Sequence, residues 1–105
     1  MTETAHNLHA EVLRAIAQET RLSILELLRD GERCVCEIFP AINQEQSNVS
    51  RHLNVMQKAG ILTRRKDGLK IFYAVKHPEV LTIIDQAAAI MKREAGKRHA
   101  LLRVV

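Results

Sequence analysis

The stretch ILTRRKDGLKIFYAV, residues 61–75, constrains the fold most, because its apolar residues alternate whereas those of the flanking segments recur at helical spacing. Ile71, Tyr73 and Val75 fall on one side of the alternation, as in a half-buried strand. Asp67-Gly68 is a two-residue hairpin signal, since glycine tolerates the positive φ that such a turn requires. The stretch therefore predicts a short β-hairpin.

Helical spacing of apolar residues predicts two helices in the first third of the chain. The first covers about residues 4–17. The second follows Thr20, a suitable N-cap, carries a stripe of leucines, and ends at Gly31.

Two further helices are predicted before the hairpin and one after it. A short helix from about Cys34 to Ile42 is interrupted at the polar turn INQEQS. The next helix runs from Ser47 to about Ala59. The last begins near Pro78 and carries an apolar stripe that is too wide for one small domain to cover.

These elements predict a single domain over residues 1–105, mainly α with a small β-hairpin. Two short helices joined by a tight polar turn and followed by a basic hairpin describe a winged helix-turn-helix. The small size, the wide stripe of the last helix and the C-terminal ALLRVV indicate that a partner covers apolar surface. The simplest such partner is a second copy of the chain, in a homodimer.

Positive charge is concentrated in the segment that is predicted to read DNA. Residues 46–76 carry seven basic side chains and one acidic one, whereas residues 1–45 carry four basic and eight acidic ones. A block this one-sided suits a polyanion such as the phosphate backbone of double-stranded DNA. The alternative is a basic surface that is merely solvated. Single-stranded nucleic acid is disfavoured, because its bases stack on aromatic side chains and this chain has few of them.

The helix from Ser47 to Ala59 has an inward apolar side and an outward polar side. The polar side can enter a major groove about 12 Å wide, where asparagine suits adenine and arginine suits guanine. The predicted DNA-contacting residues of this helix are Ser47, Asn48, Ser50, Arg51 and His52. The hairpin is better placed to contact phosphates or the minor groove, which contributes affinity more than sequence choice. Its predicted contacting residues are Arg64, Arg65, Lys66 and Lys70.

The chain has two cysteines, Cys34 and Cys36. Without a signal peptide they are interpreted as reduced thiols of a cytoplasmic protein, not as a disulfide framework. No apolar run approaches the roughly 20 residues that a membrane span needs, so no membrane partner is expected. Nothing resembles a nucleophile–base pair or a glycine-rich phosphate loop, so we expect no catalytic residues and no enzyme.

Taken together, these motifs resemble the ArsR/SmtB family of metal-sensing transcriptional repressors, and most closely its arsenic-responsive members. The resemblance covers nearly the whole chain and rests on TRLSILELL, CVCEI, SNVSRHLNVMQKAGIL and RRKDGLKIFYAV. It implies a winged-helix homodimer that pairs through its first and last helices. It also implies repression of efflux or detoxification operons, with release from operator DNA when metal binds.

The resemblance implies metal ligands at Cys34 and Cys36, because CVC is similar to the site of the family's arsenic and antimony sensors and of some cadmium and lead sensors. The chain departs from the family's patterns in three ways. Arsenic sensors often have a third cysteine where this chain has Phe39. Cadmium sensors add cysteines from the N-terminal arm, which here offers only histidines. The zinc/nickel-type site of the last helix lacks the histidine partner that should accompany Asp85.

A physical reason connects the cysteine pair to DNA binding. Thiolates are soft ligands that favour thiophilic ions, and a helix N-terminus with a nearby arginine lowers their pKa. Residues at i and i+2 of a regular helix point to opposite sides, so two sulfurs share one ion only if the first turn unwinds or was never regular. That turn belongs to the helix that positions the DNA-reading helix. Chelation should therefore re-aim the reading helix.

We expect arsenite or antimonite as inducer, with a third donor from the arm, the other subunit or a solvent thiol. Cadmium, lead or zinc would want about four ligands, which this chain assembles less easily. Two alternatives for the cysteines are buried small hydrophobes and a redox switch, although a disulfide in so small a ring should be strained as a resting state. A protein–protein adaptor and a ligand-blind architectural DNA-binding protein are the alternatives for the whole chain.

Overall fold

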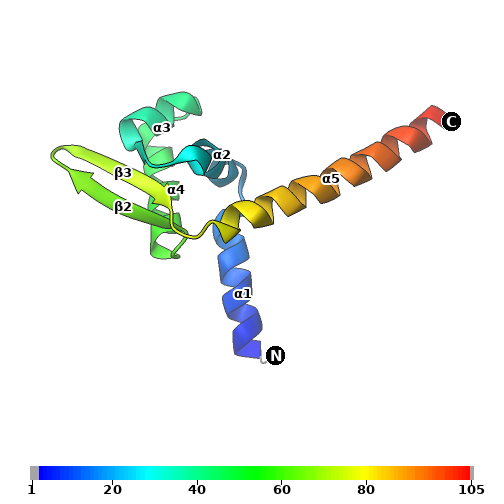
Figure 1. Ribbon diagram of the computed structural model, residues 1–105, viewed down its shortest axis with the longest axis horizontal. Helices are drawn as coiled ribbons and strands as arrows, with labels where there is room; N and C mark the ends of the chain where they lie inside the picture. Colours follow the sequence, from blue (N-terminus) through cyan, green and yellow to red (C-terminus); the bar gives the residue numbers. More distant parts are fainter. Residues whose placement is uncertain (1–2, 105) are drawn as a thin grey trace.

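The structure, a computed structural model, describes residues 3–104. Within them the helices are α1 (Glu3–Ile16), α2 (Glu19–Leu27), α3 (Val35–Ala41), α4 (Gln46–Lys58) and α5 (Glu79–Val104), with a 3₁₀ turn η1 (Leu28–Asp30) after α2 (Figure 1). The strands are β1 (Arg33–Cys34), β2 (Leu62–Asp67) and β3 (Lys70–Val75). They form an antiparallel sheet in the order β1-β3-β2.

The helices and the hairpin lie where the sequence predicts them, and the winged helix-turn-helix is confirmed. The hairpin turns at Gly68 and Leu69, one residue later than the predicted Asp67-Gly68, because Asp67 still pairs with Lys70 in the sheet. Gly68 has the positive φ, 61°, that such a two-residue turn requires. The polar turn between α3 and α4 contains Asn43 at φ 54°, a conformation that asparagine tolerates better than most residues.

Two local predictions are wrong. Cys34 was expected inside a helix, but it lies in β1, where it pairs with Phe72, and α3 begins one residue later. Thr20 was expected to cap α2, but the cap is Gln18, whose side chain accepts a hydrogen bond from the Arg21 N–H at 3.0 Å. Thr20 instead is buried and bonded to Gln44, so its hydroxyl is used in a tertiary contact.

The core lies between α2, α3, α4 and the base of the hairpin. Val49, Leu53 and Met56 are fully buried, which confirms the predicted inward side of α4. They pack with fully buried residues of the other elements, among them Ile24, Leu25, Ile38 and Leu62. The core therefore fixes α4 against the rest of the domain through one face and leaves its opposite face exposed.

Helices α1 and α5 project from this core in different directions, and α5 extends far beyond it (Figure 1). The principal extents of 59, 39 and 22 Å reflect these two arms. In α1, Ala15 and Ile16 of the last turn are buried, whereas Leu8 is 57% exposed. Along α5 the first turn is anchored by the buried Val80, whereas Ile90 and Met91 are exposed. Much of the apolar stripe predicted for the last helix is thus uncovered in the single chain.

Candidate DNA-binding surface and cysteine pair

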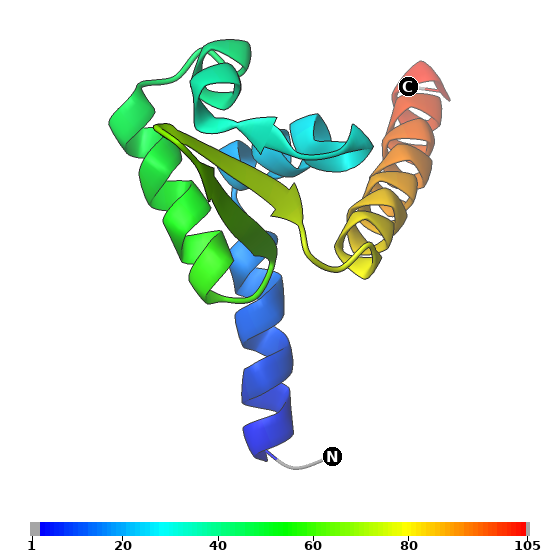
Figure 2. The ribbon, with the colours of Figure 1, turned by 60° about the vertical axis from the view of Figure 1, so that its left-hand side comes forward.

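The exposed face of α4 forms one wall of a hollow beside the hairpin. Figure 2 shows the hairpin lying alongside α4. The hollow has a volume of about 640 Å³ and its other wall is formed by Arg64 and Tyr73. The lining residues of α4 are Ser47, Ser50, Arg51, Asn54 and Gln57. Three of these were predicted, while Asn54 and Gln57 were not. Helical spacing from Ser47 and Ser50 would have found both, since they lie on the same face one and two turns later.

Asn48, predicted to contact DNA, is held in a chain of side-chain hydrogen bonds. Its amide nitrogen donates to Gln44 Oε1, and Gln44 Nε2 donates to Thr20 Oγ1 at 3.0 Å. Its oxygen accepts from Arg51 Nη2 at 2.8 Å. This chain of hydrogen bonds starts in α2 and crosses the turn between α3 and α4. It therefore ties the guanidinium of Arg51 to the core of the domain. In this structure Asn48 positions Arg51.

The structure buries His52, away from the exposed face of α4. Its side chain is 7% exposed, and Nδ1 accepts a hydrogen bond from Arg21 Nε at 3.0 Å. Burial, followed by the charges of Arg21 and Arg51, lowers the pKa of His52. The prediction of an exposed polar contact fails because the helix turns this position toward α2, where Arg21 is a partner that the local sequence does not reveal.

The basic residues of the hairpin separate into two groups. Arg65 pairs with Glu32, with Nε donating to Oε2 at 3.1 Å, and its guanidinium lies 4.6 Å from the centre of the Phe72 ring. The hydrogen bond to Glu32 raises the pKa of Arg65 and lowers that of the carboxyl group. Arg65 therefore ties the hairpin to the loop before β1, and its charge is largely compensated.

Arg64 and Lys66 lie on the opposite side of β2 from Arg65, because successive strand residues alternate in direction. Lys70 opens β3 beside the turn. All three are exposed, and among the described side chains no carboxylate forms an ion pair with any of them. These cations remain available to phosphates.

Cys34 and Cys36 meet at the junction of β1 and α3. Cys34 has extended backbone, φ −70° and ψ 144°, and serves as the N-cap of α3, accepting a hydrogen bond at Sγ from the Cys36 N–H at 3.1 Å. The Cα atoms are 5.1 Å apart and the sulfurs are joined as a disulfide. Cys34 is 3% exposed, whereas Cys36 is open to solvent.

The disulfide differs from the expectation that the thiols are reduced. It forms because only Cys36 is helical. With Cys34 in a strand, the pair never has the i, i+2 geometry of a regular helix, which would direct the two side chains apart. The two sulfurs therefore meet without an irregular first turn in α3, which is helical from Val35 onward.

The model of the arsR family of bacterial regulatory proteins matches residues 18–64, from α2 into β2. The arsenical resistance operon repressor of Escherichia coli is 38% identical over 98 residues, which is 89% of this chain and 80% of that protein. The chain belongs to the arsR family. The crystal structure of Mycobacterium tuberculosis Rv0081 is 31% identical, has a TM-score of 0.81, and matches 92% of this chain and 98% of that one.

Membership of the arsR family makes the chain a DNA-binding transcriptional regulator and not an enzyme. A second relative, an HTH-type transcriptional regulator of Methanocaldococcus jannaschii, is 38% identical over 81 residues, covering 73% of this chain and 91% of that protein. No helix in the described part of the chain combines the length and apolar character that crossing a membrane requires.

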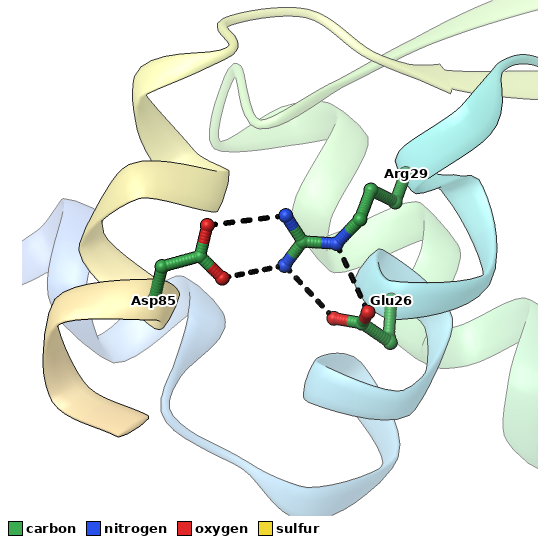
Figure 3. A network of polar contacts seen from close by, with 3 residues as sticks. All are labelled: Glu26, Arg29 and Asp85. Atoms are coloured by element: carbon green, nitrogen blue, oxygen red, sulfur yellow. Dashed lines mark hydrogen bonds and ion pairs between the residues drawn. The ribbon is translucent and has the colours of Figure 1, made fainter. Parts of the chain in front are cut away.

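In this arsR-family chain Asp85 of α5 is bound by an arginine (Figure 3). Arg29 of η1 donates to both Asp85 oxygens, at 2.8 and 3.1 Å, and also to Glu26 of α2 at 2.9 and 3.0 Å. The hydrogen bonds to Glu26 and Asp85 raise the pKa of Arg29. The cluster fastens the first part of α5 to the domain. Among the described side chains, no group of three or more histidine, cysteine, aspartate or glutamate residues is arranged to hold a metal.

Proposed function

We propose that the chain is an operator-binding repressor that leaves DNA when a soft metalloid ion, of the arsenite or antimonite type, binds Cys34 and Cys36. The observation that carries the proposal is the convergence of both sulfurs at the β1–α3 junction, directly before the DNA-reading pair of helices. Thiolates select thiophilic ions over magnesium or calcium. The similarity to a repressor of an arsenical resistance operon supports this choice of ion.

Two structural connections lead from the cysteine pair to the DNA-facing elements. Cys34 is paired with Phe72 of β3, the strand that forms the hairpin with β2. Helix α3, which begins at the pair, buries Ile38 in the core with Val49 and Leu53 of α4. An ion that draws the sulfurs into its own coordination geometry therefore acts on the wing and on the reading helix together.

The proposed DNA contacts follow from the exposed surface. Ser47, Ser50 and Arg51 face the major groove with Asn54 and Gln57, and Asn48 aims Arg51. Arg64, Lys66 and Lys70 contact phosphates, whereas His52 and Arg65 hold the domain together.

The active form is proposed to be a homodimer whose interface includes α1 and α5. Between α1, α2 and α5 lies an open, almost wholly apolar hollow of about 400 Å³, with walls that include Leu13, Leu22 and Ile84. Neighbouring Ile83 and Met91 are exposed in the single chain. A second copy would cover this surface and would pair the reading helices for a palindromic operator.

The test is release of fluorescent upstream DNA, measured by anisotropy with the reduced protein. Arsenite should weaken binding by about 100-fold, which corresponds to roughly 2.7 kcal/mol of coupling, and magnesium should have no effect. Cys34→Ser and Cys36→Ser should bind the same DNA and ignore arsenite. A fully responsive Cys36→Ser protein would rule out this site, and the absence of a specific DNA complex would indicate an adaptor.

The disulfide in the structure favours a second candidate, a thiol redox switch within the same fold. In that case the disulfide and dithiol forms should differ in operator affinity in the absence of any metalloid. Equal affinities would remove this candidate. A divalent-ion sensor is favoured less, because cadmium, lead or zinc would require about four ligands.

A further inference from the structure

A cavity of about 460 Å³ opens beside the cysteine pair. It is bounded by the start of α3, the start of α4 and the turn end of the hairpin. Both cysteines line it, and most of its remaining wall is apolar, with Val35, Phe39 and Ile71. A hollow of this size beside two thiols can hold more than a bare ion.

The chain offers inorganic arsenite one sulfur donor fewer than trivalent arsenic has bonds, so arsenite can bind but is not fully coordinated by the protein. Trivalent arsenic forms three bonds, and the chain has two cysteines. Among the described side chains, no third histidine, cysteine or carboxylate joins them in a cluster that could hold a metal. The position that would place a third side chain at the cavity is Phe39, which has no ligand atom. Arsenite on Cys34 and Cys36 therefore retains one hydroxyl that faces an apolar wall.

We infer that the ligand of this site is a trivalent arsenical with one organic substituent, R–As(OH)₂, where R is of methyl to phenyl size. This inference rests on the proposed function, because both use the same two thiols. The two cysteine S–H groups react with the two As–OH groups, which forms two As–S bonds and releases two molecules of water. Arsenic remains trivalent, its third bond is already made to carbon, and the substituent occupies the apolar cavity.

The cavity also explains how such a ligand would act on DNA binding. Its walls include Gln46 and Ser50 of α4 and Lys70 of β3. Ser50 and Tyr73 line both this cavity and the DNA-facing hollow. A substituent held here presses directly on the reading helix and the wing, so a larger substituent should release DNA more completely.

The test uses the full chain after reduction with a phosphine. The phosphine opens the disulfide, takes oxygen from water to become the phosphine oxide, and is removed so that no small thiol competes. Arsenite, methylarsonous acid and phenylarsonous acid are then compared. Intact mass and free-thiol count measure binding, and fluorescence anisotropy measures release of upstream DNA.

Both organic arsenicals should bind once per chain with loss of both free thiols. Phenylarsonous acid should release DNA at a concentration roughly tenfold or more below that of arsenite, because the ring is buried against apolar walls. Arsenite acting as strongly as phenylarsonous acid, with no thiol added, would overturn the inference and leave the proposed function intact. Failure of every arsenical to release DNA would overturn both.

Phe39→Cys and Phe39→Leu form a matched pair of variants. The cysteine supplies a third sulfur at the cavity wall, so arsenite should bind with loss of three thiols and the preference for the phenyl compound should shrink. The leucine keeps the wall apolar and should retain the preference. If both variants respond alike to arsenite, a shortage of sulfur donors does not limit arsenite binding, and the inference fails. Circular dichroism checks that both variants are folded.

Discussion

In the proposed function, polar side chains of α4 divide between DNA recognition and stability, and His52 is the clearest case of a side chain that serves stability. Its imidazole accepts a hydrogen bond from Arg21 and is nearly inaccessible to solvent. The neutral ring can accept that bond, whereas the protonated ring would face the guanidinium groups of Arg21 and Arg51. The residue thus favours the folded chain only while it is neutral.

This gives a prediction for the dependence of stability on pH. The pKa of His52 is lowered in the folded chain relative to about 6.5 when unfolded, so the unfolded chain binds more protons between the two values. The contribution of His52 to stability should be complete above about pH 6.5 and should be lost as the pH falls through the folded-state pKa. Urea unfolding followed across this range measures it.

The substitution His52→Asn isolates the effect, because asparagine keeps a side-chain hydrogen-bond acceptor but does not titrate. The His52→Asn protein should lose less stability on acidification than the unchanged protein. Parallel pH profiles of the two proteins would contradict the assignment and would shift the effect to carboxylates elsewhere.

Arg51 is the side chain of α4 that is both exposed and aimed by a partner. Arg51→Ala should reduce operator affinity by about 1–3 kcal/mol and relax the base preference at one position. Asn48→Ala should reproduce part of this loss of affinity, because Arg51 would remain but would lose the hydrogen bond that orients its guanidinium. Binding to a set of single-base operator variants measures both effects. Loss of affinity for all sequences alike in Arg51→Ala would assign Arg51 to a phosphate.

At the scale of elements, the sequence predicts those helices and strands whose apolar residues recur with a clear period. The alternation of residues 61–75 and the Asp-Gly turn identify the hairpin, and the inward side of α4 follows from its spacing. Strand β1 has only two residues, too few to show a period, and it exists because β3 offers an edge to pair with. The disulfide follows from that pairing, so neither it nor the burial of Cys34 could be predicted from local sequence.

The two faces of β2 give a prediction about salt dependence. Lys66 is unpaired by any described carboxylate and Arg65 is paired with Glu32. Lys66→Ala should lower the slope of log affinity against log salt by about one, because one fewer counterion is released on binding. Arg65→Ala should leave the slope nearly unchanged and lower the stability only slightly, because the ion pair that it removes is exposed to solvent. If both variants changed the slope equally, Arg65 would have exchanged its ion pair with Glu32 for a DNA phosphate on binding.

At the scale of the whole molecule, the contacts of Arg29 determine how the long helix α5 is attached to the domain. Arg29 joins α2 and η1 to α5 through Glu26 and Asp85, so α5 leaves the domain in a fixed direction (Figure 3). The exposed apolar surface of α1 and α5 begins just beyond this anchor. The uncovered stripe was predictable from its width, but the route of α5 was not, because it depends on an ion pair between residues 56 positions apart.

Met91→Glu tests whether that surface is the interface of a dimer. Met91 is exposed in the single chain and lines the apolar hollow between α1, α2 and α5. A glutamate there should leave the fold intact but place a charge in the interface, where burial without a partner costs several kcal/mol. Sedimentation should show a monomer, and affinity for a palindromic operator should fall by roughly 100-fold or more, because the two half-sites are no longer bound together. Lys92→Glu, which alters charge at the adjacent exposed position, should remain dimeric. A dimeric Met91→Glu protein would place the interface on another surface.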